Sequence, residues 1–250
     1  MRTLLLSTLL GGLLTAATAP DAYAQPTGLL TRTVRLGQDA YSFQVHVPAK
    51  FQGREKLPVI LFLHGIGQRG EGGFVPVEGT AGVVARNYLE QVPAVVVLPQ
   101  CRQNRYWNDP DMERMVIAAV EQTMAEFSAD SRRLYLAGVS MGGYGAWHMA
   151  AEHAGKFAAV VPICGGSPLR ERDRFTPIAR RIGRTPVWVF HGAEDRIVPV
   201  SESRRMVEAL KAVAGSRVRY NEYPGVGHNV WFKALAEPEL MTWLFAQRLD

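Results

Sequence analysis

The chain has 250 residues, of which 47% are hydrophobic and 20% are charged. This length and composition predict one folded domain with a sizeable core and exclude a disordered chain. The net charge of +5 comes largely from arginines spread along the sequence, and no basic run alternates with aromatic residues. The sequence therefore argues against a nucleic-acid-binding surface.

Residues 1–24 have the pattern of a secretory signal. Arg2 provides a positive charge, residues 4–17 are apolar, and the triplet Ala-Tyr-Ala at 22–24 fits the small-residue rule for a cleavage site. The apolar stretch is shorter than the roughly 20 residues of a spanning helix, which argues against a stable membrane anchor. We therefore expect residues 25–250 to be the mature, single domain of a secreted or periplasmic protein.

Apolar stretches at regular intervals predict the strands of the domain. Residues 31–36 and 41–47 alternate in polarity on either side of a turn and predict a hairpin. Later stretches predict strands of a parallel sheet that are buried on both faces. They lie at 57–63, 93–98, 134–137, 158–163 and 186–190, followed by a more amphipathic last strand at 218–223.

Segments with apolar residues at helical spacing lie between these strands. One helix is expected to follow Asp109 as its N-cap, and another covers residues 143–152. Ser201 is expected to cap a third helix, and residues 230–248 predict a terminal helix with a potential break at Pro238. Strands that alternate with helices after a hairpin predict an α/β three-layer sandwich, mostly parallel with antiparallel N-terminal strands.

The sequence Gly-Val-Ser-Met-Gly at 138–142 fits the pattern G-x-S-x-G. In this nucleophile elbow a serine lies on a strained strand-to-helix turn, so the residues two positions away must be very small. The following helix directs its N-terminal N–H groups towards the serine oxygen. Ser140 is therefore the candidate nucleophile, although a glycine-rich turn can match this pattern by chance.

A glycine-rich segment after the strand at 57–63 has two interpretations. Residues 65–70 match the dinucleotide pattern G-x-G-x-x-G, but a loop follows them where that site needs a helix. The sequence His-Gly-Ile-Gly at 64–67 instead resembles the oxyanion loop of α/β-hydrolases. This resemblance implies that the backbone N–H groups of Ile66 and Met141 form the oxyanion hole, with His64 bracing the loop.

Two later loops carry an acid and a base. Asp195 follows the strand at 186–190, and its neighbour Glu194 is expected to point elsewhere. Asp173 is a weaker alternative because no strand precedes it. His228 lies between the last strand and the last helix. These loops are expected at the carboxyl ends of parallel strands, where open α/β sheets bind their ligands.

The order Ser140, Asp195, His228 is that of the α/β-hydrolases. The chain resembles this superfamily and, within it, secreted esterases of the feruloyl esterase, polyhydroxybutyrate depolymerase and phospholipase/carboxylesterase groups, with dienelactone-hydrolase-like proteins also similar. The resemblance implies that carboxylic esters, small or polymeric, are hydrolysed through a Ser-His-Asp triad and an acyl-enzyme, without a metal or other cofactor. The segments that carry it are 62–67, 138–143 and 191–195.

The spacing of the last strands bears on the substrate. In this superfamily a cap usually follows the strand after the elbow helix, but here residues 164–185 leave room only for a short helix at 175–182. We therefore expect no large cap, and a shallow, open site suited to bulky or polymer-linked esters of the feruloyl, acetyl or polyester type. We hypothesise that the side chains of Trp107 and Trp231 flank the substrate. For each of them, packing in the hydrophobic core is an equally weighted alternative.

Two questions stay open at this point, the functional class and the state of the two cysteines. A serine peptidase and a non-catalytic binding protein of the same fold are the alternatives to an esterase. Cys101 and Cys164 can form a disulfide after export or remain two free thiols. They are too few for a metal site, and neither shows metal-ligand spacing.

Overall fold

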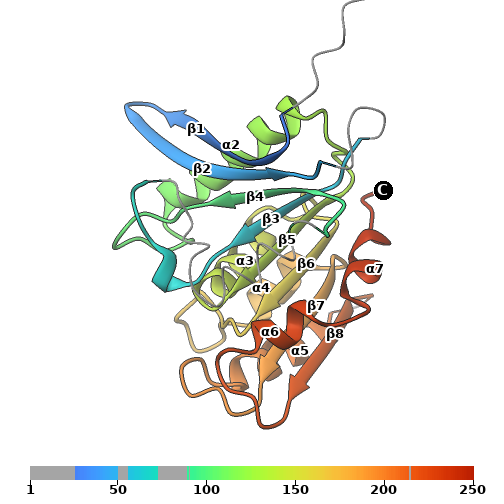
Figure 1. The fold of residues 1–250 in the computed structure, drawn as a ribbon. Helices are drawn as coiled ribbons and strands as arrows, with labels where there is room; N and C mark the ends of the chain where they lie inside the picture. The colour runs from blue at the N-terminus through green and yellow to red at the C-terminus, as the bar shows by residue number, and fades with distance from the viewer. Residues whose placement is uncertain (1–25, 50–55, 73–88, 90, 214) are drawn as a thin grey trace, which may run out of the picture.

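The structure, a computed structural model, describes residues 26–49, 56–72, 89, 91–213 and 215–250. The predicted signal at 1–24 lies outside these residues. The described part contains one eight-stranded sheet in the order β1-β2-β4-β3-β5-β6-β7-β8 (Figure 1). The antiparallel pairs are β1 with β2 and β2 with β4, and every other neighbouring pair is parallel. The predicted mixed sheet is therefore confirmed.

The strands form close to where the apolar stretches predict them. The opening hairpin consists of β1 (Gly28–Leu36) and β2 (Asp39–Val47). The remaining strands are β3 (Val59–Leu63), β4 (Val95–Pro99), β5 (Leu134–Val139), β6 (Ala159–Ile163), β7 (Pro186–Gly192) and β8 (Arg217–Tyr223).

Helices cover both faces of the sheet, which gives the three layers (Figure 1). Neighbouring strand residues point into opposite layers, so that Leu61 belongs to one hydrophobic cluster and Ile60 to the other. One face is covered by α2 (Pro110–Glu126), α3 (Met141–Glu152), α4 (Thr176–Ile182) and α5 (Ser201–Lys211). The other is covered by α6 (Trp231–Leu235) and α7 (Leu240–Phe245).

The ends of the helices agree with the predictions in part. Pro238 lies between α6 and α7, so the predicted break is confirmed. Asp109 occupies the N-cap position of α2, but its Oδ2 accepts a hydrogen bond from the Tyr106 N–H at 3.0 Å. Ser201 does not cap α5, since it is the first residue of that helix and Val200 precedes it as N-cap.

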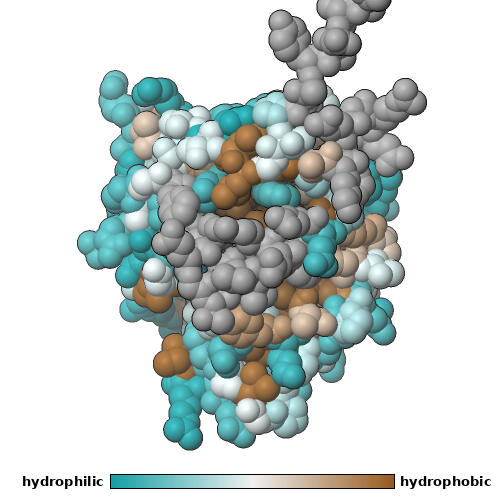
Figure 2. All heavy atoms as spheres, in the orientation of Figure 1, coloured by the Kyte–Doolittle hydropathy of each residue, from teal (hydrophilic) through white to brown (hydrophobic). Residues whose placement is uncertain are grey.

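The surface seen in Figure 2 is mostly hydrophilic, with apolar side chains in several separate patches. Within the described ranges, no helix combines the length and the apolar character that crossing a membrane requires.

Strand register brings the candidate loops to one edge of the sheet. Leu63 at the end of β3 pairs with Gly138 in β5, and Gly192 at the end of β7 pairs with Tyr223 at the end of β8. Because these strands are parallel, the loops that follow them leave the sheet side by side. Between β6 and β7, where every residue is described, α4 is the only helix, so this connection carries no large cap.

Candidate active site

Ser140 lies on a strained turn between β5 and α3. Its backbone angles are φ 57° and ψ −116°, which residues with a side chain rarely adopt. A Cβ atom at Gly138 would lie 2.0 Å from the carbonyl oxygen of Gly142, and one at Gly142 would lie 1.9 Å from that of Leu63. The predicted need for very small residues on both sides of the serine is therefore confirmed.

His228 connects Ser140 to Asp195. Its Nε2 lies 2.8 Å from Ser140 Oγ, and its Nδ1 lies 2.7 Å from Asp195 Oδ2. Since a carboxylate only accepts, Nδ1 carries the proton and Nε2 is free to accept from the serine hydroxyl. The structure thus brings together the three residues expected from the chain order. Glu194 is exposed, and Asp173 is exposed and accepts from the Thr176 N–H instead.

The carboxylate of Asp195 is buried but well supplied with donors. Its Oδ1 accepts from the N–H groups of Ile197 and Val198, each at 2.9 Å. Burial alone would raise the pKa of Asp195, but the hydrogen bonds from His228, Val198 and Ile197 outweigh it and hold the pKa below its ordinary value. Asp195 is therefore ionised at neutral pH and fixes the imidazole of His228 in one tautomer.

His191, which sequence reasoning did not assign to the site, lies beneath Asp195. Its Nε2 is 2.9 Å from the carbonyl oxygen of Val198 and 3.2 Å from Asp195 Oδ2, while Nδ1 is 2.6 Å from Ser203 Oγ. Because a carbonyl only accepts, Nε2 carries the proton and the Ser203 hydroxyl donates to Nδ1. The ring is fully buried, and burial lowers its pKa. The sequence contained one signal for this contact, because His191 lies at the end of a buried strand and four residues before Asp195.

Two backbone N–H groups predicted to form an oxyanion hole lie at helix starts next to Ser140. Met141 is the first residue of α3, and Ile66 is the first residue of the 3-10 helix η1 (Ile66–Gln68). In the described residues, neither N–H donates to a backbone carbonyl. A Cβ atom at Gly65 would lie 3.6 Å from Ser140 Cβ, so this loop runs directly past the serine. The arrangement suits the predicted role, which stays a prediction.

The imidazole of His64 holds the glycine-rich loop in place through hydrogen bonds to the backbone. Its Nε2 accepts from the Cys101 N–H at 3.0 Å, so the proton is on Nδ1, which donates to the carbonyl oxygen of Gly65 at 2.6 Å. Burial lowers the pKa of His64 to about 4, against the opposing effect of the bond to Gly65. A neutral histidine with both ring nitrogens hydrogen bonded agrees with the predicted bracing position, and His228 stays the predicted base.

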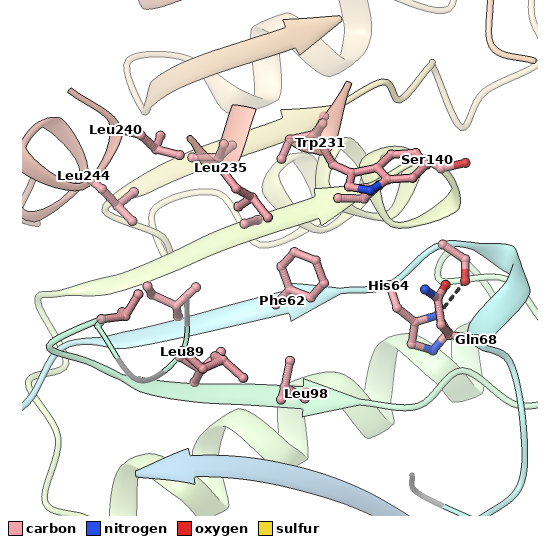
Figure 3. A pocket seen from close by; sticks show the side chains of 18 of the residues that line it. Phe62, His64, Gln68, Leu89, Leu98, Ser140, Trp231, Leu235, Leu240 and Leu244 are labelled. Atoms are coloured by element: carbon pink, nitrogen blue, oxygen red, sulfur yellow. Dashed lines mark hydrogen bonds between the residues drawn. The ribbon is translucent and has the colours of Figure 1, made fainter. Parts of the chain in front are cut away.

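A cavity of about 290 Å³ begins at Ser140 and extends over the sheet towards α7. Figure 3 shows Ser140, His64 and Gln68 near one end of it and Leu89, Leu240 and Leu244 at the other. The expectation of a shallow site is therefore wrong. The short β6–β7 connection correctly indicated that no cap domain is inserted there, but the cavity lies between the sheet and the helices of its other face.

Comparison with known proteins identifies the family. Residues 103–239 match the family model described as phospholipase/carboxylesterase. The chain belongs to this family. Esterase LipC of Mycobacterium tuberculosis is 44% identical over 62 residues, which are 25% of this chain and 13% of that protein. The chain therefore spans only a small part of that relative.

Solved structures share the α/β-hydrolase fold of this family member. A thermostable esterase is 33% identical, with a TM-score of 0.77, over 88% of this chain and 63% of the other. A feruloyl esterase module from Clostridium thermocellum has 19% identity and a TM-score of 0.66 over 92% of this chain and 93% of the module. At that identity, the second likeness concerns the fold alone.

The two tryptophans proposed to flank the substrate lie in different layers of this phospholipase/carboxylesterase family protein. Trp107 is 1% exposed, belongs to the cluster under α3, and donates its indole N–H to the His64 carbonyl at 3.0 Å. The hypothesis is therefore wrong for Trp107, whose side chain is buried in the core and is not among the described residues that line the cavity. Trp231 lines the cavity, with its ring 5.8 Å from that of His228, and its predicted contact with substrate stays a prediction.

Both cysteines of this family member are buried free thiols. Cys164 lies behind the triad, and its Sγ and the nearest ligand atoms of Asp195 and His228 are all within 4.8 Å of one another. These atom types can bind zinc. However, burial raises the pKa of Cys164 to about 12, and the carboxylate and imidazole are hydrogen bonded to each other. The group therefore fits a protonated thiol packed behind the triad better than a metal site.

The depressed pKa of His64 predicts a loss of stability in mild acid. The unfolded chain takes up a proton near pH 6.5, whereas the folded chain resists protonation down to about pH 4. Stability should therefore fall as the pH drops through this window, with about 3 kcal/mol attributable to His64. Urea unfolding from pH 7 to pH 4 measures this, and His64→Gln should flatten the dependence. Equal slopes for the two proteins would contradict the assignment.

Proposed function

We propose that this protein is a serine esterase that hydrolyses carboxylic esters through Ser140, His228 and Asp195. The observation that carries the proposal is the continuous hydrogen-bonded line from Ser140 Oγ through both ring nitrogens of His228 to Asp195, at 2.8 and 2.7 Å. A nucleophile, a base and a group that orients the base are the requirements for acyl transfer.

In the first step, His228 Nε2 takes the hydroxyl proton as Ser140 Oγ attacks the ester carbonyl carbon. The negative charge that develops on the carbonyl oxygen is stabilised by the N–H groups of Met141 and Ile66, and removal of one such donor typically lowers kcat by about 10²–10³. The ionised Asp195 stabilises the imidazolium. His228 then gives its proton to the departing alcohol, which leaves the acyl group on Ser140.

In the second step, water attacks the acyl-enzyme while His228 accepts one of its protons. His228 then returns this proton to Ser140 Oγ as the acyl–oxygen bond breaks, which releases the carboxylic acid and restores the serine hydroxyl. The alcohol half of the ester is expected to lie at the mouth of the cavity, beside the exposed side chain of Ile66, which is 48% accessible. A bulky or polymer-linked alcohol is compatible with this position. The sequence of residues 1–24 supports the further proposal that the enzyme acts after export.

Labelling with a fluorophosphonate tests the proposal, because this probe reacts with an activated serine. The wild-type protein should be labelled on Ser140, and Ser140→Ala should abolish labelling while its circular dichroism is unchanged. Ser201→Ala is the matched control, since Ser201 is exposed at the start of α5. Its labelling should equal that of the wild type.

Failure of the folded wild type to react with the probe, or equal labelling of Ser140→Ala, would overturn the proposal. A panel of ester, polyester and peptide-amide substrates then separates esterase from peptidase activity. Hydrolysis of the amide in preference to the esters would contradict the esterase assignment and favour a peptidase.

A further inference from the structure

We propose that the cavity beside Ser140 binds the acyl chain, and that the preferred substrates are esters of unbranched aliphatic acids of medium length. This inference rests on the proposed esterase function and specifies its substrate class. It comes from three properties of the cavity, namely the chemistry of its walls, its volume and its closed far end.

The walls of the cavity are apolar except at the mouth. Among the described residues, the polar side-chain groups that line it are those of His64, Gln68, Ser140 and His228 and the indole N–H of Trp231, whose ring lies 5.8 Å from that of His228. Beyond them the floor is made by side chains of alternate residues in β3, β4, β5 and β6, such as Phe62 in β3. Among the described residues, an alkyl chain whose carbonyl is positioned at Ser140 therefore meets mostly apolar side chains.

This lining discriminates against aromatic acids that carry oxygen substituents. A feruloyl group has a phenolic hydroxyl and a methoxy oxygen on the side of the ring away from the ester. Beyond the indole N–H of Trp231, which lies beside His228, the described lining offers no side-chain nitrogen or oxygen, so a hydroxyl deeper in the cavity would be buried without a partner. An aliphatic chain of similar length has no such group to desolvate.

The volume of the cavity limits the length of the acyl chain that it can hold. A methylene group is about as large as a water molecule, whose share of liquid volume is about 30 Å³. A cavity of about 290 Å³ therefore accommodates a chain of about ten carbon atoms. Each methylene transferred from water to this lining should raise kcat/KM by up to about fourfold while room remains.

The end far from the nucleophile is closed by leucines. Leu240 and Leu244 in α7 are 2% and 3% exposed, and Leu89 on the opposite wall is 9% exposed. Figure 3 shows these three side chains at the end of the cavity opposite Ser140. A longer acyl chain would have to displace packed core residues, so activity should fall once the cavity is full.

The experiment is a series of p-nitrophenyl esters from acetate to palmitate, with p-nitrophenyl ferulate alongside, assayed with the wild type and with cavity variants. We expect kcat/KM to rise from acetate to about the decanoate, to fall for the palmitate, and to be lower for the ferulate than for the decanoate. Leu244→Trp shortens the far end and should lower the decanoate-to-acetate ratio at least about tenfold.

Leu98→Phe, which narrows the middle of the cavity, provides a second test if Leu244→Trp does not fold. Leu29→Trp is the matched control, because Leu29 lies in β1 with 43% of its surface exposed. Its chain-length profile should equal that of the wild type. Folding of each variant is checked by circular dichroism and thermal unfolding.

The outcomes separate this inference from the function on which it rests. Hydrolysis of the acetate with no gain from longer chains, or a preference for the ferulate, would overturn the acyl-chain assignment and leave the esterase intact. An unchanged ratio in folded Leu244→Trp and Leu98→Phe would do the same. Absence of both ester hydrolysis and fluorophosphonate labelling would instead remove the esterase proposal itself.

Discussion

Replacement of Asp195 by asparagine is expected to lower kcat for ester hydrolysis by about ten-thousandfold with little change in KM. An asparagine amide facing His228 Nδ1 would donate rather than accept, so the imidazole would carry its proton on Nε2. That nitrogen lies 2.8 Å from Ser140 Oγ and could then no longer accept the serine proton. The loop itself should survive, since asparagine keeps one oxygen to accept from the N–H groups of Ile197 and Val198.

Steady-state kinetics on an acetate ester measures this effect, with thermal unfolding as the check on folding. The neighbouring carboxylate provides the control, because Glu194 is exposed. Glu194→Gln should leave kcat unchanged. A loss of less than about tenfold in folded Asp195→Asn would show that Asp195 does not orient the base, since removal of an orienting acid has a far larger effect.

Replacement of Gly142 by alanine is expected to prevent folding into the native structure. The new Cβ would lie 1.9 Å from the carbonyl oxygen of Leu63, which is backbone of the adjacent strand β3 and cannot rotate away. Relief requires separation of α3 from the sheet, at a cost above about 4 kcal/mol. Such a cost is a large share of the roughly 5–15 kcal/mol that stabilises a typical domain.

The yield of soluble protein and the thermal unfolding midpoint provide the measurements. Gly72→Ala is the control, since a Cβ there has no atom within 4 Å and its backbone φ is not in the left-handed region. This variant should fold normally, with stability within about 1 kcal/mol of the wild type. A stable, active Gly142→Ala protein would mean that the turn at Ser140 is looser than the structure indicates.

The sheet could be predicted from sequence because its central strands are buried on both faces. Continuous apolar runs such as the one ending at Leu63 have no other stable place in a chain of this composition. The break at Pro238 was equally readable, because proline lacks the N–H that a continuing helix needs. The cap of α5 was not, since its N-cap is the apolar Val200, which the preference for polar capping residues does not predict.

The candidate site was predictable to the extent that it depends on chain order. Ser140, Asp195 and His228 each follow a strand, so the topology alone brings their loops together. The position of Trp107 depends on a loop whose path the sequence does not reveal, and its indole packs under α3. The contact of His191 with Asp195 depends on side-chain rotamers, and the cavity depends on how tightly α6 and α7 pack on the sheet.

The cavity lies inside the second hydrophobic cluster rather than beside it. Ile60, Val96, Leu98, Leu240 and Leu244 are at once core residues of that layer and walls of the proposed acyl site. An occupant of the cavity would therefore complete the core of the protein. Binding of a fatty acid in the cavity would then raise the free energy of unfolding. At a hundred times its Kd, the fatty acid would add about 2.7 kcal/mol to the stability of the whole domain.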